Sequence, residues 1–541
     1  MIHHKFLKCA LLGGALLAAG AAFAQPQPVD TNRLLLDLLV KKGVLTQDEA
    51  TTLENQVQAA AAANAAAANT AAANANAAAD KANAAAASAQ AAATAAAAPV
   101  PARAVVSGGA NGSPLSFKIG SANFTPVGFL DFTTVYRSAL NGGDIGSSFG
   151  SVPYGNTAND QLSEVRFSAK NSRLGLKVDS DVDGTKVLGY VESDFLGNAA
   201  TNINVASNSD VMRMRVYFVD LRRGQWEFLA GQDWSMLTPN RKGISPMPSD
   251  IFYTQDVDTN YQVGLVWGRT PQVRVVYHPS DEWALGLSAE NPDQYVGSAV
   301  VLPSNLTATD VDNGSNGTAT PNEAPDLIGK IAFDTKIGDL PFHADLAGLL
   351  RTFKINTFAT GASPINSDAT ATGGGGSYNM ILSLAPNFSL IENAFISKGG
   401  GRYISTGLGP DFTVTPPDAT GTDQIKTVYS YADMLGFEWD AQPLTKIFAY
   451  YGQAHFGNSY QKSGSTYYGY GYPGSPNTNN KLIEEYTVGL AQTLWKNPTK
   501  GDLKFLTQFS YLDRDPWVVA TGTPSSAHLG MVYADLRYDL P

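Results

Sequence analysis

The sequence of 541 residues has a single cysteine, Cys9, close to its start. We expect Cys9 to be removed with a signal peptide, so that the mature chain has no cysteine at all. A disulfide framework is therefore excluded. A chain of this length can bury enough surface to fold without one.

Long apolar runs are also absent. After the first 24 residues, no segment has 18 consecutive apolar residues except an alanine-rich tract, which is too weakly hydrophobic to insert into lipid. Lipid tolerates only helices and closed barrels. Any membrane span in the mature chain must therefore be made of β-strands.

Catalytic motifs are missing too. The mature chain has four histidines and contains no HExxH, GxSxG or nucleotide-binding glycine loop. The glycine run Gly373 to Gly376 has no lysine or helix after it, so we interpret it as a loop. We expect no enzymatic activity, no cofactor and no metal. A barrel phospholipase that uses a serine and a histidine is the alternative. The histidines are His278, His343, His455 and His528.

Positive charge is in short supply. The chain has 37 Lys and Arg against 48 Asp and Glu, and loss of residues 1–24 removes Lys5 and Lys8, which gives 35 − 48 = −13. An acidic surface repels polyanions, which argues against nucleic acid as a partner.

The chain begins MIHHKFLKCALLGGALLAAGAAFAQ, with lysines ahead of an apolar run that ends in Ala22-Phe23-Ala24. This order is typical of a secretory signal peptide, and we predict cleavage after Ala24. A membrane-anchoring helix is the alternative. It is disfavoured because the run is shorter than the roughly 20 residues that a span needs.

Residues 25–98 are predicted to form a helical periplasmic arm. Asp30 can cap a short helix that ends at Gly43, and the capping box from Thr46 to Glu49 opens a second helix. Residues 59–98 are almost entirely alanine, the best helix former. The arm is either an oligomeric coiled coil, with peptidoglycan as a further candidate contact, or a solvated flexible helix without a partner. Residues 99–114, rich in Pro and Gly, are predicted to be a linker.

From Pro126 to the last residue, strand-like runs recur, separated by connections that alternate between short and long. We count 16 strands if Tyr261 to His278 is one strand bulged at Arg269 to Pro271. This rhythm is the signature of an outer-membrane barrel, here residues 115–541. The fold class expected is an all-β transmembrane barrel of 16 antiparallel strands with an N-terminal α-helical arm. A large soluble β-protein is the alternative.

Alternation within the runs predicts which face meets lipid. In MRMRVYF, the apolar Met212, Met214, Val216 and Phe218 share the lipid face, and Arg213, Arg215 and Tyr217 share the lumenal face. A second run places Phe342, Ala344, Leu346, Gly348 and Leu350 opposite His343, Asp345 and Arg351. In the last run, Val532 and Leu536 oppose Tyr533 and Asp535. Interfacial aromatic girdles are predicted for Trp226, Trp439, Tyr486, Trp495, Phe509, Tyr511 and Tyr538.

Residues 234–259 follow the fifth predicted strand and are too polar and proline-rich to form another. We expect this loop to fold inward and to form a constriction. Folded inward, it would bring Arg241, Lys242, Asp250, Asp256 and Asp258 towards a wall that carries Arg213 and Arg215. Other cations predicted to face the lumen are Arg166, Arg173, Arg274, Lys330 and Arg351.

Rings of arginine and lysine select anions, and the planar guanidinium suits carboxylate or phosphate. The alternative is that these cations only neutralise lumenal acids. The acids concerned are Glu192, Asp194, Glu227 and Asp345.

The stretches KVLGYVESDFLG, MRMRVYFVDL, WEFLAGQDWSML, PSDIFYTQDVD, VGLVWGRTPQVRVVY and LGLSAENP resemble the DcaP-like outer-membrane porins, which are related in style to phosphate-selective porins. The resemblance implies a homotrimer of 16-stranded barrels, a periplasmic coiled coil, and uptake of small anions through an arginine-lined constriction. By position, it implies this role for Arg213, Arg215 and Arg274. The ending YDLP departs from the pattern, since many such barrels end on Phe.

Together, these features predict a porin of the bacterial outer membrane, surrounded by lipid and lipopolysaccharide. It would let small hydrophilic solutes diffuse passively and favour anions such as dicarboxylates or phosphate. Two alternatives remain open. One is a structural anchor with a periplasmic tether, and the other is a non-selective or cation-preferring pore.

Overall fold

The computed structural model of the chain divides into two compact units, residues 1–104 and residues 105–541. It describes residues 113–197, 211–297, 299–306, 324–357, 367–405, 407–416 and 423–541, together with 311, 322 and nine residues between 40 and 55. The predicted signal peptide, most of the predicted arm and nearly all of the linker lie outside the described residues. Among the described residues, no helix is both long and apolar enough to cross a membrane.

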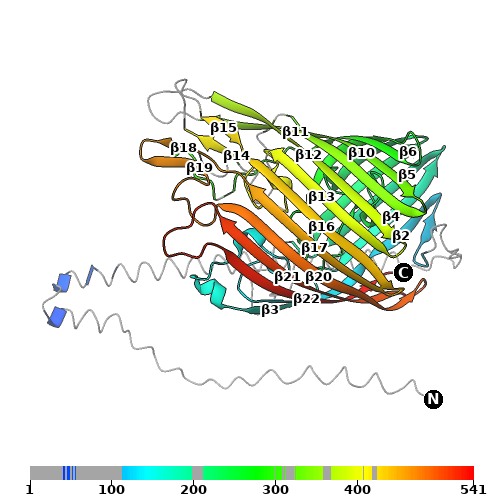
Figure 1. Cartoon of the computed structure of the whole chain (residues 1–541), viewed down its shortest axis with the longest axis horizontal. Coiled ribbons are helices and arrows are strands. Elements are labelled where there is room, and N and C mark those ends of the chain that lie inside the picture. Colours follow the sequence, from blue (N-terminus) through cyan, green and yellow to red (C-terminus); the bar gives the residue numbers. More distant parts are fainter. Residues whose placement is uncertain are drawn as a thin grey trace, which may run out of the picture. The chain divides into compact units, whose positions relative to one another are not determined.

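One antiparallel sheet of eighteen strands dominates the second unit and curves round into a barrel (Figure 1). Its two ends meet where β2 pairs with β22. The strand β1 (Phe117–Ile119) only adds a short hairpin to the start of β2. The others, in chain order, are β2 (Ala122–Arg137), β3 (Glu164–Ser168), β4 (Arg173–Val182), β5 (Thr185–Asp194), β6 (Arg213–Arg223), β7 (Trp226–Trp234), β8 (Arg269–Tyr277), β9 (Trp283–Glu290), β10 (Asp326–Ile337), β11 (Leu340–Thr357), β12 (Ser367–Ala385), β13 (Phe388–Lys398), β16 (Tyr429–Gln442), β17 (Thr445–Phe456), β20 (Asn480–Asn497), β21 (Gly501–Pro516) and β22 (Ala527–Asp539).

The closed sheet is a barrel of sixteen strands, as predicted. Both β3 and β4 pair with β2, β3 along Thr133 to Arg137 and β4 along Asn123 to Phe129. They are therefore two halves of one barrel strand, interrupted at residues 169–172. With β3 and β4 counted once and β1 left out, sixteen strands close the barrel.

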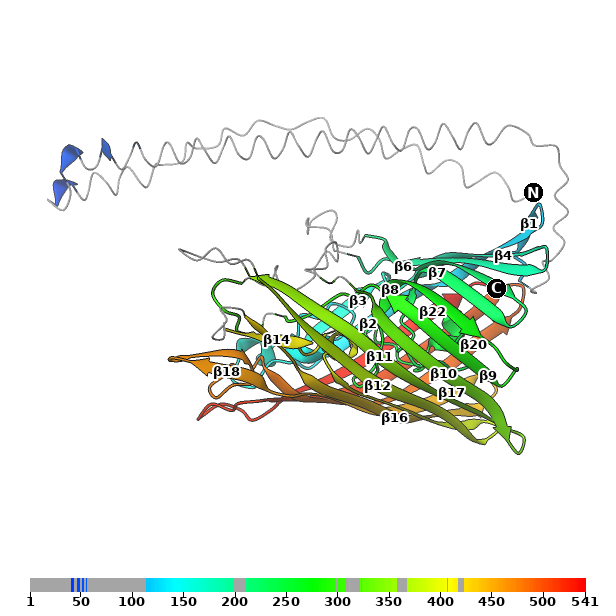
Figure 2. The same cartoon turned by 90° about the horizontal axis from the view of Figure 1, so that it is seen from above.

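Short turns and long connections lie at opposite ends of the barrel. The hairpins β14 (Phe412–Thr415) with β15 (Gln424–Thr427) and β18 (Ser459–Ser463) with β19 (Thr466–Tyr470) belong to long connections. Figures 1 and 2 place β14 and β18 at one end of the barrel and the C-terminus at the other. We call these the long-loop end and the short-turn end.

The prediction of one strand from Tyr261 to His278 was wrong. Strand β8 starts at Arg269, and Pro271 lies within it opposite Gln232 of β7 without splitting it. Residues 261–268 turn into the barrel, where Val266 forms an isolated bridge with Ile404. The strand count is unaffected because β8 still spans from β7 to β9.

The prediction of which side chains of β6 face the lumen was wrong for the residues after Arg215. A register shift pairs Glu192 with Val216 but Ser193 with Met214, so Arg215 is the extra residue of a β-bulge. The bulge reverses the alternation. Val216 and Phe218 are therefore buried on the lumenal side, and Tyr217 faces outward.

Other facing predictions are confirmed. On β11, Leu346 is 62% exposed and Leu350 is 55% exposed, whereas Asp345 and Arg351 are buried. On β22, Val532 and Leu536 face outward, and Tyr533 and Asp535 face the lumen. Large aromatic side chains are exposed on the outer face, as expected for interfacial girdles. They include Trp226, Trp439, Tyr486, Trp495, Phe509 and Tyr511.

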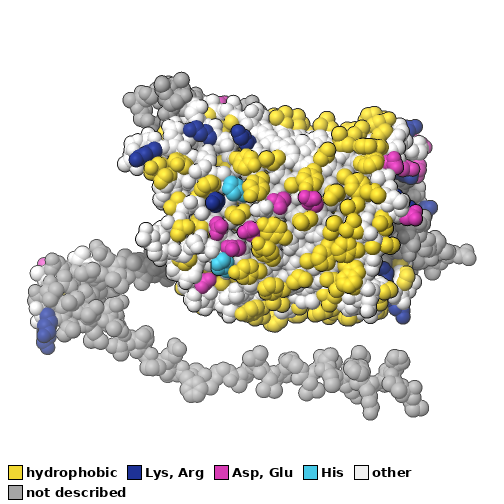
Figure 3. Space-filling view, viewed as in Figure 1, with side chains coloured by type: hydrophobic (Ala, Val, Ile, Leu, Met, Phe, Trp, Pro, Cys, Tyr) yellow, Lys and Arg dark blue, Asp and Glu magenta, His cyan; other side chains and the backbone are white. Residues whose placement is uncertain are grey.

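A polar row interrupts the apolar outer face towards the long-loop end. Asp433, Gln453, Glu484, Asp513 and His528 are direct partners on five adjacent strands. Figure 3 shows acidic and histidine side chains gathered among hydrophobic ones on this face. A row of this kind suits the level of lipid headgroups, where charged side chains cost far less than in hydrocarbon.

The outward apolar face can be tested at Leu346, near the middle of β11. We expect Leu346→Arg to lower the free energy of unfolding in lipid vesicles by about 2–4 kcal/mol, because a cation is placed against hydrocarbon. Leu346→Ala is the control for lost side-chain volume and should cost less. Equal stability of the Arg and Ala variants, measured by urea titration, would mean that Leu346 does not face lipid.

Candidate functional site

Residues 235–268, which we call the inward segment, connect β7 to β8 through the interior of the barrel. The segment contains one short helix, α3 (Pro248–Ile251). Its polar groups bond to side chains on strands around the whole wall. These contacts run from Met236 N to Glu290 (2.8 Å), from Asn240 N to Asp345 (3.3 Å), from Arg241 to Glu438 (2.6 Å), from Val257 N to Gln508 (2.7 Å) and from Val263 N to Glu485 (2.8 Å).

Two glycines let the inward segment touch the wall backbone. A Cβ on Gly452 of β17 would lie 1.8 Å from the carbonyl oxygen of Val263, and one on Gly264 would lie 2.0 Å from that of Asp433. Gly264 also has a φ of +92°, which favours glycine. The contact therefore depends on the absence of a side chain on both surfaces.

The inward segment carries two carboxyl groups that are buried at the wall. Burial, followed by the neighbouring Asp258 and Glu438, raises the pKa of Asp256 well above its usual range. Burial also raises the pKa of Asp258, although Ser147 N (3.1 Å) and Asn260 N (2.8 Å) donate to its carboxylate. Burial in this part of the segment therefore disfavours the charged form of both carboxyl groups.

Arginines gather on one side of the segment, around two buried acids of β5. Arg215 contacts both acids, Glu192 at 2.6 Å and Asp194 at 2.8 Å. Arg213 pairs with Asp194 at 2.7 Å and keeps 37% of its side chain exposed. Arg173 of β4 lies 3.8 Å from Glu192.

Aromatic rings of the inward segment and of β7 pack against these arginines. The guanidinium of Arg215 lies 5.9 Å from the ring centre of Trp234, and that of Arg173 lies 5.2 Å from Phe252. The Tyr261 hydroxyl is 3.4 Å from Arg215. Rings and ion pairs together hold the guanidinium planes in fixed orientations.

Arg269, the first residue of β8, belongs to this group and was missed by sequence reasoning. Its guanidinium lies 5.3 Å from the ring centre of Trp234, and its Nη1 is buried without a hydrogen-bond partner. The sequence stretch GRTP suggested only a bulge, because the strand start was placed too early. We call Arg173, Arg213, Arg215 and Arg269 the arginine cluster.

The remaining predicted cations are dispersed, and all except Lys242 form an ion pair with an acid. Arg241 pairs with Glu438 on β16 and so is not brought to Arg213 and Arg215. Lys242 is exposed and borders two cavities of about 620 and 610 Å³. The other pairs are Arg166 with Glu164 (2.7 Å), Arg274 with Asp233 (3.2 Å), Lys330 with Asp345 (3.3 Å), and Arg351 with Asp326 (3.3 Å) and Asp411 (3.1 Å).

A third cavity, of about 430 Å³, opens beside the arginine cluster. Arg173 and Phe252 line it, together with charged residues near the short-turn end of the barrel. Within the described residues, no group of three His, Cys, Asp or Glu side chains is placed to hold a metal ion. The charged residues that line this cavity besides Arg173 are Lys446, Lys496, Lys504, Arg537, Asp440, Asp502 and Asp539.

These features define a closed antiparallel barrel of sixteen strands whose lumen is crossed by a wall-anchored segment. No family model matches the sequence, and no curated protein matches it. Among solved structures, the outer membrane channel DcaP of Acinetobacter baumannii matches with a TM-score of 0.56 and 18% identity, over 78% of this chain and 99% of that chain. The likeness to DcaP that the sequence motifs predicted is thus found in the fold.

Two further solved structures match less well. The anion-selective porin from Comamonas acidovorans has a TM-score of 0.43 and 13% identity, and covers 77% of this chain and 99% of its own. OmpT of Vibrio cholerae has a TM-score of 0.42 and 12% identity, and covers 78% and 99%.

The glycine contact predicts an effect of Gly452→Ala. Its methyl group must displace the inward segment, so we expect a loss of about 1–3 kcal/mol of stability, as for other overpacked sites. Gly329→Ala is the matched control, since a Cβ there meets nothing within 4 Å. The measurement is the denaturant midpoint of both variants, and a Gly452→Ala midpoint equal to that of the control would contradict the contact.

The pKa of Asp256 predicts a pH dependence. A carboxyl whose pKa is raised on folding stabilises the fold below its unfolded pKa, and this contribution is lost as the pH rises through the folded value. We therefore expect Asp256→Asn to raise the melting temperature at about pH 8, and the gain to vanish near pH 4. The exposed Asp281→Asn is the control. A gain that is the same at both pH values would show that ionisation of Asp256 is not its source.

Proposed function

We propose that this protein is an outer-membrane porin through which small hydrophilic solutes diffuse passively, with a preference for anions. The observation that carries the preference is the arginine cluster, in which four guanidinium groups surround two carboxylates, Glu192 and Asp194. The local charge is therefore positive although the chain as a whole is acidic. Dicarboxylates and phosphate are the solute classes proposed.

The membrane assignment rests on the closed sheet and its outer surface. The outward side chains of adjacent strands are mostly large and apolar, and many of them are aromatic. A soluble barrel would not expose such a belt. The short-turn end would face the periplasm, as in other bacterial barrels, and lipid and lipopolysaccharide would surround the belt.

The four arginines have different tasks in this proposal. Arg215 is buried and forms ion pairs with both Glu192 and Asp194, so it holds these two acids in position. Arg213 is partly exposed, and Arg269 has a donor with no hydrogen-bond partner. Arg213 can therefore donate to a carboxylate or phosphate that arrives in the channel, whereas Arg269, whose free donor is buried, supports the site through its positive charge.

Most other lumenal cations serve to neutralise a neighbouring acid. Arg274, Lys330 and Arg351 each meet an aspartate and are at most 4% exposed. They therefore add no free charge to the path. If the cluster were neutralised in the same way, the alternative of a non-selective or cation-preferring pore would follow.

Other parts of the proposal concern residues outside the barrel. We propose a signal peptide at residues 1–24, a periplasmic helical arm at residues 25–98 with peptidoglycan as a candidate contact, and assembly as a homotrimer. In support, the sequence has a small-x-small cleavage pattern, capping motifs and an alanine-rich tract.

The charge preference can be measured as the reversal potential in a KCl gradient across a planar bilayer. We expect anion selectivity in the wild type and a smaller preference in Arg269→Gln, because this change removes one positive charge from the cluster. Arg213→Ala with Arg215→Ala should lower it further, since Glu192 and Asp194 then face the path. Arg223→Gln, at the exposed turn after β6, is the control for a lost positive charge. Cation selectivity that none of these changes affects would refute the anion preference.

A structural anchor is the rival function, and deletion of residues 25–110 separates the two. A porin should still conduct after the deletion, because the barrel starts later. A protein that conducts in neither form, but that loses envelope attachment on deletion, would be the anchor.

A further inference from the structure

The inward segment is joined inside the barrel by a second loop, which follows β13. We call residues 399–405 and 407–411 the second loop; it includes a short 3-10 helix, η3 (Gly401–Tyr403). Val266 of the inward segment and Ile404 of the second loop form an antiparallel bridge. Trp267 N donates to Tyr403 O (3.0 Å), and Ser405 N donates to Leu265 O (3.2 Å). The two elements therefore pair like strands within the lumen.

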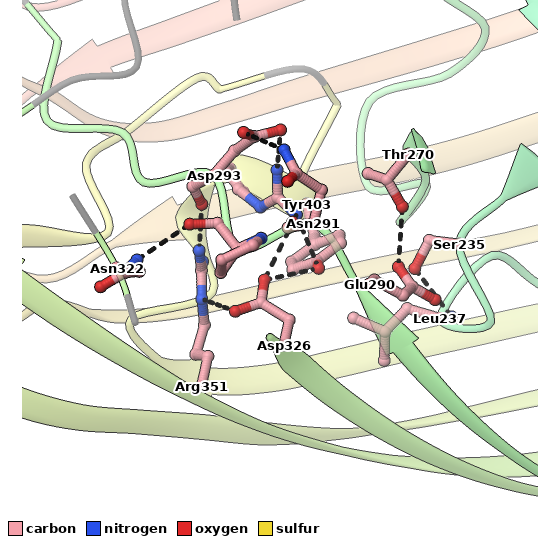
Figure 4. A network of polar contacts seen from close by, with 12 residues as sticks. Ser235, Leu237, Thr270, Glu290, Asn291, Asp293, Asn322, Asp326, Arg351 and Tyr403 are labelled. Carbon is pink, nitrogen blue, oxygen red and sulfur yellow. Dashed lines mark hydrogen bonds and ion pairs between the residues drawn. The ribbon is translucent and has the colours of Figure 1, made fainter. Parts of the chain in front are cut away.

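Arg351 of β11 attaches the second loop to the wall. Its side chain is fully buried and forms ion pairs with Asp326 at the start of β10 (3.3 Å) and Asp411 of the second loop (3.1 Å). Its Nη1 also donates to the carbonyl oxygen of Gly399 (2.8 Å). Figure 4 shows Arg351 directed at Asp326 and at the Asn291–Asp293 stretch.

Arg402 completes the attachment from the loop side. It pairs with Asp293 (3.1 Å) and Asp326 (3.2 Å), and the neighbouring Tyr403 hydroxyl donates to Asp326 (2.8 Å). The backbone N–H of Arg402 donates to Asp411 (2.8 Å). We call Arg351, Arg402, Asp293, Asp326 and Asp411 the ionic lock, which connects β10, β11, the stretch after β9 and the second loop.

The ionic lock is sensitive to the loss of one member. Asp326 and Asp411 are both fully buried, so removal of Arg351 leaves Asp411 without an ion pair, and removal of both arginines does the same to Asp326, where water is excluded. A carboxylate that stays ionised becomes hydrated only if the loop moves. Such a movement would break the bridge to Val266.

We propose that Arg351 and Arg402 are positioning residues that fasten the second loop onto the inward segment, so that two joined elements, rather than one, restrict the channel. The sequence predicted only that Arg351 is a cation of the channel wall, and the proposal gives it the further task of holding the second loop. The proposal rests on the porin function proposed above. Opening the lock should widen the path and make it fluctuate, while the arginine cluster and its charge preference stay in place.

The bridge offers a direct test by cross-linking. Val266 and Ile404 face each other without exchanging hydrogen bonds, a pairing in which Cα atoms lie about 4.5 Å apart, close enough for a disulfide. Val266→Cys with Ile404→Cys is made together with Cys9→Ser, so that no other thiol is present. The rate of disulfide formation on oxidation and the single-channel conductance are both measured.

With the lock intact, we expect rapid cross-linking and no change of conductance on oxidation. With Arg351→Gln and Arg402→Gln added, we expect cross-linking about tenfold slower, since the thiols no longer stay within bonding distance. Before oxidation the conductance should be larger and noisier, and the disulfide should return it to the wild-type level. The reversal potential should remain near that of the wild type. If this variant does not fold, Arg402→Gln alone replaces it.

Lys354→Gln is the matched control. It removes a positive charge from the same strand, where Lys354 pairs with the exposed Asp368 at 3.1 Å. This variant should cross-link and conduct like the parent. Cross-linking that is equally fast with and without the lock, or a conductance that neither opening the lock nor the disulfide changes, would overturn the proposal. A protein that never conducts would refute the porin function, while the cross-linking rates would still decide whether the lock positions the loop.

Discussion

The structure depends on one constraint: a backbone that faces lipid must satisfy every hydrogen bond within the chain. The pairing of β2 with β22 meets this constraint, because it leaves no open edge in the main sheet. Closure of the sheet also gives the side chains of each strand two different environments. One face of each strand turns outward and is apolar, and the other faces an enclosed space where polar groups need partners.

The enclosed space explains the inward segment. Wall carboxylates such as Glu290 and Glu485 would be costly to bury without donors, and the backbone N–H groups of Met236 and Val263 supply them. Regular helix within the segment is limited to α3, which is four residues long. Wall and segment thus complete each other's hydrogen bonding, which makes the segment part of the folded core of the barrel.

Much of the fold could be predicted because it depends on local periodicity. Strand number, the alternation of connections and the facing of β11 and β22 follow from side-chain alternation and turn residues alone. The bulge at Arg215 could not be predicted, because one extra residue leaves the composition of the run unchanged and only the pairing with β5 reveals it. The same holds for Arg269, which joins the cluster only because β8 starts where the inward segment ends.

The ion-pair partners of the arginines could not be predicted from the sequence for a related reason. Which acid meets Arg241 or Arg351 depends on contacts between residues that lie far apart in the chain, as with Glu438 or Asp411. Net charge gives no guidance either. At physiological ionic strength, exposed charges are screened over about 8 Å. In the proposed pore, acids on the rim therefore have little influence on an ion beside the arginine cluster, and the balance of charge within that cluster decides whether an anion or a cation is favoured. Four guanidinium groups against Glu192 and Asp194 leave that balance positive in a chain whose total is negative.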